Sequence, residues 1–183
     1  MVRGRTQRTA TVGVAENSNS AVLVTIGPGG ELLDRRRIAL TDGGLPTHPH
    51  HHEGSWAVGR YLNTPGARTL SLADAVALVE RVRASAARGA RDGLEALAAA
   101  VPVPIVSIAI RACPTLPPTT EERIADNRAQ TVADSVMYRE ALATAAEARG
   151  WSVRWYDRER VFRDAAAAAL AATARRAGRT TSR

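Results

Sequence analysis

The feature that most constrains the fold of this chain is a continuous apolar run at residues 105–110, rich in Ile and Val. A short run of this kind is typical of a strand in the middle of a parallel or mixed sheet that is covered on both faces. Pro102 and Pro104 precede the run and Pro114 follows it, so the strand is bounded on both sides. We therefore expect an α/β protein with this strand inside its sheet.

Three further strands are predicted before this one. Residues 9–15 alternate small and β-branched side chains, residues 21–26 form a Val, Leu and Ile run, and residues 31–40 resume the strand pattern after a Gly-Pro-Gly-Gly turn. The polar stretch 16–20 separates the first two strands and favours a hairpin. The chain thus begins with three consecutive strands.

A long helix is predicted to follow them. Ser71 and Asp74 fit a capping box, and apolar residues recur on one helical face up to about residue 90. Gly89 and Gly93 are expected to interrupt this helix before a second helical stretch at residues 94–100.

The last part of the chain alternates helix and strand. A helix is predicted from Thr119 to Gly150, a short strand at residues 152–156, and a final helix at residues 158–174 with Asp157 as its N-cap. There is no internal repeat or long linker, so residues 9–174 are expected to form one domain.

Length and composition place limits on where the protein works. A chain of 183 residues buries enough surface for one core, and Cys113, the single cysteine, excludes a disulfide within the chain. No stretch approaches 18 consecutive apolar residues. We expect a cytoplasmic protein that does not bind or cross membranes.

The net charge of +7 comes from the ends of the chain. Residues 1–8 and 175–183 carry seven arginines and no acid, whereas the remaining 18 arginines balance the 18 Asp and Glu residues. Two interpretations of these basic, disordered tails stay open. They are solvated ends that aid solubility, or they bind nucleic acid.

The element order βββαβαβα resembles that of the ribonuclease H-like superfamily, over residues 9–174. The early hairpin is similar to that of actin-like ATPases and sugar kinases as well. The amino-acid sequences at residues 45–53 and 127–130 also resemble those of a group of uncharacterised actinobacterial proteins. This resemblance implies no activity.

The superfamily resemblance implies a place for catalytic acids. Nucleases of this fold use carboxylates from the first strand, the fourth strand and the last helix to hold two divalent metal ions. Here the first-strand position falls on Ala15, with Glu16 one step later on the opposite side, and the fourth-strand position falls near Arg111. Only Asp157 and Asp164 match the last helix, and together with Glu16 they are the candidate catalytic residues.

All four histidines of the chain lie between residues 48 and 53, followed by an acid. His48, His50, His52 and Glu53 are therefore candidate ligands for a divalent metal such as zinc, manganese or magnesium. The alternatives are a polar loop whose histidines cap strand ends or contact Glu53, and a loop that contacts phosphate when protonated.

Aromatic and basic residues also gather at residues 151–158, a composition that can stack single-stranded bases. Strand alternation instead favours Val153 and Trp155 as core residues.

Together these patterns predict a degenerate, non-catalytic ribonuclease H-like domain that binds nucleic acid, through the Arg-rich tails, or a protein partner. The alternative is a metal-dependent phosphodiesterase or related hydrolase that uses the loop 48–53 together with Glu16. The first requires only a basic face, and the second requires a bound metal close to Glu16.

Overall fold

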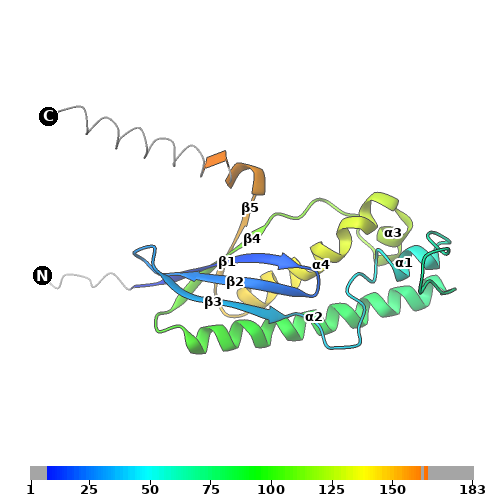
Figure 1. Ribbon diagram of the computed structural model, residues 1–183. Coiled ribbons are helices and arrows are strands. Elements are labelled where there is room, and N and C mark those ends of the chain that lie inside the picture. The colour runs from blue at the N-terminus through cyan, green and yellow to red at the C-terminus, as the bar shows by residue number, and fades with distance from the viewer. Residues whose placement is uncertain (1–7, 162, 165–183) are drawn as a thin grey trace, which may run out of the picture.

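A five-stranded sheet with the order β3-β2-β1-β4-β5 organises the computed structural model, which describes residues 8–161, 163 and 164 (Figure 1). The strands are β1 (Ala10–Asn17), β2 (Ser20–Ile26), β3 (Leu32–Ala39), β4 (Ile105–Arg111) and β5 (Ser152–Tyr156). β1, β2 and β3 pair antiparallel, whereas β4 runs parallel to β1, and β5 runs parallel to β4. The predicted α/β class with a mixed sheet is confirmed.

The predicted hairpin connects β1 and β2 through Ser18 and Asn19. Ser18 has a positive φ of 52°, and Glu16 Oε1 accepts a hydrogen bond from its backbone N–H at 3.1 Å. The polar residues of this stretch therefore fix a tight turn, as their side-chain chemistry predicts.

Among the described residues, four helices lie between β3 and β5: α1 (Glu53–Ala57), α2 (Leu72–Ala100), α3 (Thr120–Ala125) and α4 (Asn127–Glu147). α2 and α4 pack against each other and cover the same face of the sheet (Figure 1). The expected helix from Thr119 is divided in two, because Asp126 is extended and caps α4 through the N–H groups of Arg128 and Ala129. The short helix α1 was not predicted.

The expected interruption of α2 at its glycines is wrong, since one helix of 29 residues runs through both. A Cβ atom at Gly89 would lie 2.4 Å from the carbonyl oxygen of Leu40, and one at Gly93 would lie 2.7 Å from the Ile38 side chain. The glycines therefore allow the helix to approach the end of β3 and the segment after it.

The core lies between the sheet and α2 and α4, and its strand residues come from alternate positions. Val12, Leu23, Ile108 and Ile110 are all fully buried there. Val106 of β4, which lies at the irregularity in the pairing of β4 with β1, is 43% exposed. Within the described residues the covering helices lie on one face of the sheet, which differs from the expected cover on both faces.

Trp155 also departs from expectation. β5 is an edge strand, and the Trp155 side chain is 47% exposed instead of packed in the core. Val153 is partly buried and packs against the core. Burial of the aromatic ring was predicted from strand alternation alone, which does not show that the strand lies at an edge.

The chain turns helical after β5. The backbone N–H of Val161 donates to Asp157 O at 3.0 Å, and the carboxylate of Asp157 caps this turn as predicted. The rest of the predicted last helix, residue 162 and the residues from 165, lies outside the described residues, as do both basic tails apart from Arg8. No helix within the described part of the chain is long and apolar enough to span a membrane.

Candidate functional site

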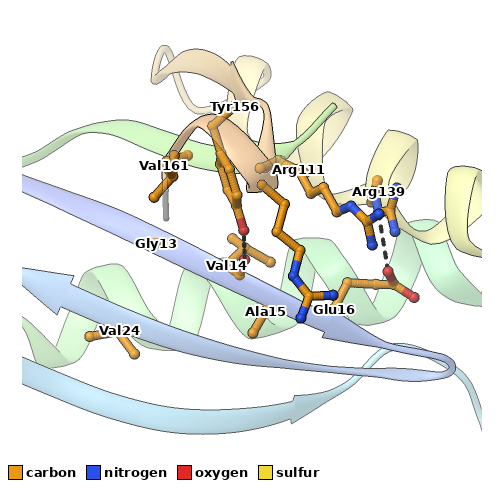
Figure 2. Close-up of a pocket in the computed structure, with 12 residues that line it drawn as sticks. Gly13, Val14, Ala15, Glu16, Val24, Arg111, Arg139, Tyr156 and Val161 are labelled. Atoms are coloured by element: carbon orange, nitrogen blue, oxygen red, sulfur yellow. Dashed lines mark hydrogen bonds and ion pairs between the residues drawn. The ribbon is translucent and has the colours of Figure 1, made fainter. Parts of the chain in front are cut away.

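The carboxyl ends of β1, β4 and β5 meet at one edge of the sheet, because these strands are parallel. Ligands of open α/β sheets bind outside such strand ends. Glu16 lies next to the end of β1, Arg111 ends β4, and Tyr156 ends β5. Figure 2 shows these three side chains around one cavity of 720 Å³. This edge is the candidate functional site.

A buried ion pair occupies the centre of this edge. Arg139 of α4 donates from Nε to Glu16 Oε2 at 3.1 Å, and the two side chains are only 9% and 6% exposed (Figure 2). Arg139 also donates from Nη1 to the carbonyl oxygen of Ala112, just beyond β4, at 3.3 Å. The guanidinium thus ties the end of β1 to the end of β4.

The charge state of Glu16 depends on two opposing influences. Burial raises the pKa of Glu16 above its ordinary value of 4.5, and the nearby positive charge of Arg139 lowers it by less. Since a permanently charged guanidinium lies directly against the carboxylate, a divalent cation at the same oxygens would be repelled.

Positive charge predominates in the lining of the first cavity, where Arg111, Arg139 and Arg158 outnumber the single acid Glu16. A second cavity of 790 Å³ shares Arg111, Arg139, Tyr156 and Arg158 with the first and is also lined by Asp157 and Glu159. Arg111 is exposed and lies at the mouth of both cavities. An edge with this charge is suited to bind an anion, because guanidinium groups match phosphate oxygens in geometry and charge.

The structure separates the three predicted catalytic acids. Glu16 lines the first cavity, and Asp157 lines the second. Asp157 Oδ1 accepts from the backbone N–H groups of Glu159 at 2.8 Å and Arg160 at 3.2 Å, so this oxygen serves as a helix cap. Asp164 is 73% exposed and forms a surface ion pair with Arg160 at 3.8 Å.

The histidine loop is held by a carboxylate that the sequence did not single out. His50 is fully buried, and its Nδ1 lies 2.8 Å from Asp134 Oδ1 of α4. The backbone N–H groups of His50 and His51 donate to the two oxygens of Asp134 at 3.0 and 3.1 Å. Three hydrogen bonds to one carboxylate anchor this loop to α4.

The remaining loop residues contact one another. His52 lies with its ring centroid 5.3 Å from the rings of both His48 and His51. Burial raises the pKa of Glu53 and lowers the pKa of His51. His50 Nε2, His51 Nδ1 and Glu53 Oε2 are buried, and no hydrogen-bond partner for them is found among the described residues.

The predicted metal ligands His48, His50, His52 and Glu53 lie in one loop but do not form a metal-binding group within the described part of the chain. No group of three or more His, Cys, Asp or Glu side chains there has an arrangement that could hold a metal ion. His50 is paired with Asp134, and His48 bridges Ser18 and Thr47 through its two ring nitrogens, at 3.0 and 2.8 Å.

Sequence reasoning missed Arg139 and Asp134, the two charged residues that organise the edge and the loop. Both lie on α4, which is buried on much of its circumference and shows little separation of polar and apolar faces. One signal was present, since Asp134 falls one helical turn before the buried Tyr138 and so on the same face.

Comparison with known proteins adds no relative. No protein-family model matches the chain, and no curated protein is significantly similar to it.

Proposed function

We propose that this chain is a ribonuclease H-like domain without a nuclease centre that binds nucleic acid. The element order supports the fold assignment, because three antiparallel strands are followed by helix, parallel strand, helix and parallel strand. The function is inferred from the residues at the carboxyl edge of β1 and β4.

One observation carries the proposal: at two positions where the nuclease reaction needs carboxylates, the chain has an arginine and an alanine. Arg111 ends β4, and Ala15 occupies the first-strand position without any ligating group. The neighbouring acid, Glu16, has a guanidinium in direct contact. An edge of this charge repels metal ions and attracts the phosphates of a nucleic acid backbone.

The hydrolase alternative is favoured by one contact. Ser18 donates from its backbone N–H to Glu16 and shares a hydrogen bond between its Oγ and His48 Nε2, so Glu16 and the histidine loop meet at the same turn. Elemental analysis of untagged wild type and of a His50→Ala/His52→Ala variant tests this alternative. Stoichiometric metal that the variant loses would favour it.

The proposal is tested by binding of labelled oligonucleotides, followed by fluorescence anisotropy, to wild type and to Arg111→Glu. We expect the variant to bind about tenfold more weakly, since it places a negative charge where a phosphate contact is proposed. Arg81→Glu, at an exposed position on α2, is the matched control and should retain wild-type affinity. Equal affinities of wild type and Arg111→Glu, or no binding by the wild type, would contradict the proposal.

A further inference from the structure

The face of the sheet opposite α2 and α4, here called the open face, has an unusual cross-strand pattern. Gly13 of β1 pairs with Val24 of β2 on one side and with Ala109 of β4 on the other. Val24 in turn pairs with Arg35 of β3, and Ala109 pairs with Arg154 of β5. Directly paired residues share a face, so one row crosses all five strands with an arginine at each end.

The next row repeats this arrangement on one half of the sheet only. Ala15 pairs with Val22, which pairs with Arg37, whereas on the other half Arg111 of β4 pairs with Tyr156 of β5. In both rows the β1 and β2 positions hold Gly, Ala or Val, and Ala109 continues this surface on β4. Gly13, Ala15, Val24 and Ala109 form a floor of short side chains that lines the 720 Å³ cavity.

Charge on the open face has one sign. Arg35, Arg37, Arg111 and Arg154 are all exposed, and neither row contains an acid. The acids of the same strands point the other way. Asp34 pairs with the buried Thr25 on the helix-covered face, and Glu16 contacts Arg139 of α4.

The dimensions and chemistry of this face fit a single strand better than a duplex. Neighbouring strands lie about 4.8 Å apart, so the backbones at the two ends of a row are about 19 Å apart. A floor of Gly, Ala and Val has no side chain long enough to enter a duplex groove and reach base edges. It is open, however, to unpaired bases lying flat.

Tyr156 supplies an aromatic ring at the margin of this floor. Its hydroxyl donates to the carbonyl oxygen of Val14 at 3.2 Å, which fixes the ring over the end of the sheet (Figure 2). A ring held in this way is a stacking partner for a base, and stacking on aromatic side chains tolerates any base.

We propose that the open face binds single-stranded nucleic acid, with phosphates at Arg35, Arg37, Arg111 and Arg154 and bases on the floor between them. This inference rests on the proposed function and names the surface and the form of nucleic acid. It identifies a site separate from the basic tails.

The test compares two triple variants of the full chain in binding to labelled single-stranded and duplex oligonucleotides of equal length. Arg35→Ala/Arg37→Ala/Arg154→Ala removes three charges from the open face. Arg81→Ala/Arg91→Ala/Arg128→Ala removes three exposed charges from α2 and α4. We expect the first variant to bind the single strand at least about tenfold more weakly. The slope of its salt dependence should be shallower by about two, because each of the three lost phosphate contacts contributes about 0.7. The control should bind within about twofold of wild type.

A second variant tests the same surface if the triple variant of the open face does not fold. Ala15→Glu places a carboxylate on the floor at an exposed position, and it should weaken single-strand binding without changing the thermal unfolding midpoint.

Three results would overturn the inference. Equal losses in the two triple variants would show that total charge alone matters. Preference for the duplex would assign a different ligand. Another occupant would be shown by cross-links that persist with excess oligonucleotide and join the floor to residues 162–183 or to a second copy of the chain. In each case a wild type that still binds nucleic acid leaves the proposed function standing, whereas a wild type that binds none overturns both.

Discussion

Arg139 determines, at the scale of single residues, what the carboxyl edge can do. Its guanidinium contacts both Glu16 and the carbonyl oxygen of Ala112 while the side chain is nine-tenths buried. A buried carboxylate without a positive partner is costly, and a buried guanidinium without a negative partner is equally so. The two residues therefore depend on each other, and Glu16 is bound to Arg139 in the protein without any ligand.

Arg139→Met is expected to lower the free energy of unfolding by about 3 kcal/mol at neutral pH, because it leaves the Glu16 carboxylate buried and unpaired. The decrease in the free energy of unfolding should be smaller at acidic pH. Without Arg139 the pKa of Glu16 rises further, so the folded state takes up a proton more readily than the unfolded state. Stability is then fully retained below the ordinary pKa of 4.5 and is lost as the pH rises through the folded-state pKa.

Urea denaturation at pH 4 and at pH 7.5 measures this dependence. The double variant Glu16→Gln/Arg139→Met is the control, and it should recover part of the stability at pH 7.5 because no charge remains buried. A loss that is equal at both pH values would show that Arg139 acts through packing alone.

At the scale of elements, α2 shows where sequence patterns succeed and where they fail. Its start was predicted because the capping interaction is local: Ser71 Oγ accepts from the N–H of Asp74. Its continuity was not predicted, because Gly89 and Gly93 respond to contacts with residues about 50 positions away. Strands and the β1–β2 turn were predicted for the same local reasons, since alternation and turn chemistry are visible in short windows.

Gly89→Ala is expected to lower the free energy of unfolding by about 2 kcal/mol. Helix propensity alone favours Ala over Gly by about 1 kcal/mol, but the added Cβ would lie 2.4 Å from the backbone oxygen of Leu40, which cannot move aside as a side chain could. Chemical denaturation measures the change. Ala87→Gly, at an exposed position of the same helix, is the control for propensity and should cost about 1 kcal/mol. Stabilisation by Gly89→Ala would contradict the close approach.

At the scale of the whole molecule, the distribution of charge matters more than its sum. The sequence between the tails is formally neutral, and the nucleic-acid contacts expected from the sequence lay in the basic tails, at residues 151–158 or in the histidine loop. Strand register divides the charged strand residues between an open face with four arginines and a helix-covered face with Asp34, Glu16 and Arg36. The alternation is present in the sequence, but it does not show which face the helices cover, because that depends on how α2 and α4 pack.

The candidate site was predictable to the same limited extent. The absence of carboxylates at Ala15 and Arg111 follows from the strand pattern and the superfamily resemblance. The partners Arg139 and Asp134 do not follow from it, because they lie more than 80 residues from the His50 and Glu16 groups that they contact. Contacts at such separation are set by tertiary packing, which local periodicity does not encode.

The salt dependence of single-strand binding tests the central claim most directly. Wild-type protein is titrated into a labelled single-stranded oligonucleotide at several salt concentrations, and the oligonucleotide is then recovered after incubation with magnesium or manganese. Four phosphate contacts on a single strand predict a slope of about −3 for the logarithm of the affinity against the logarithm of the salt concentration. We expect this slope and an intact oligonucleotide. A slope near zero, or metal-dependent cleavage that Glu16→Gln abolishes, would contradict a domain that binds nucleic acid without cutting it.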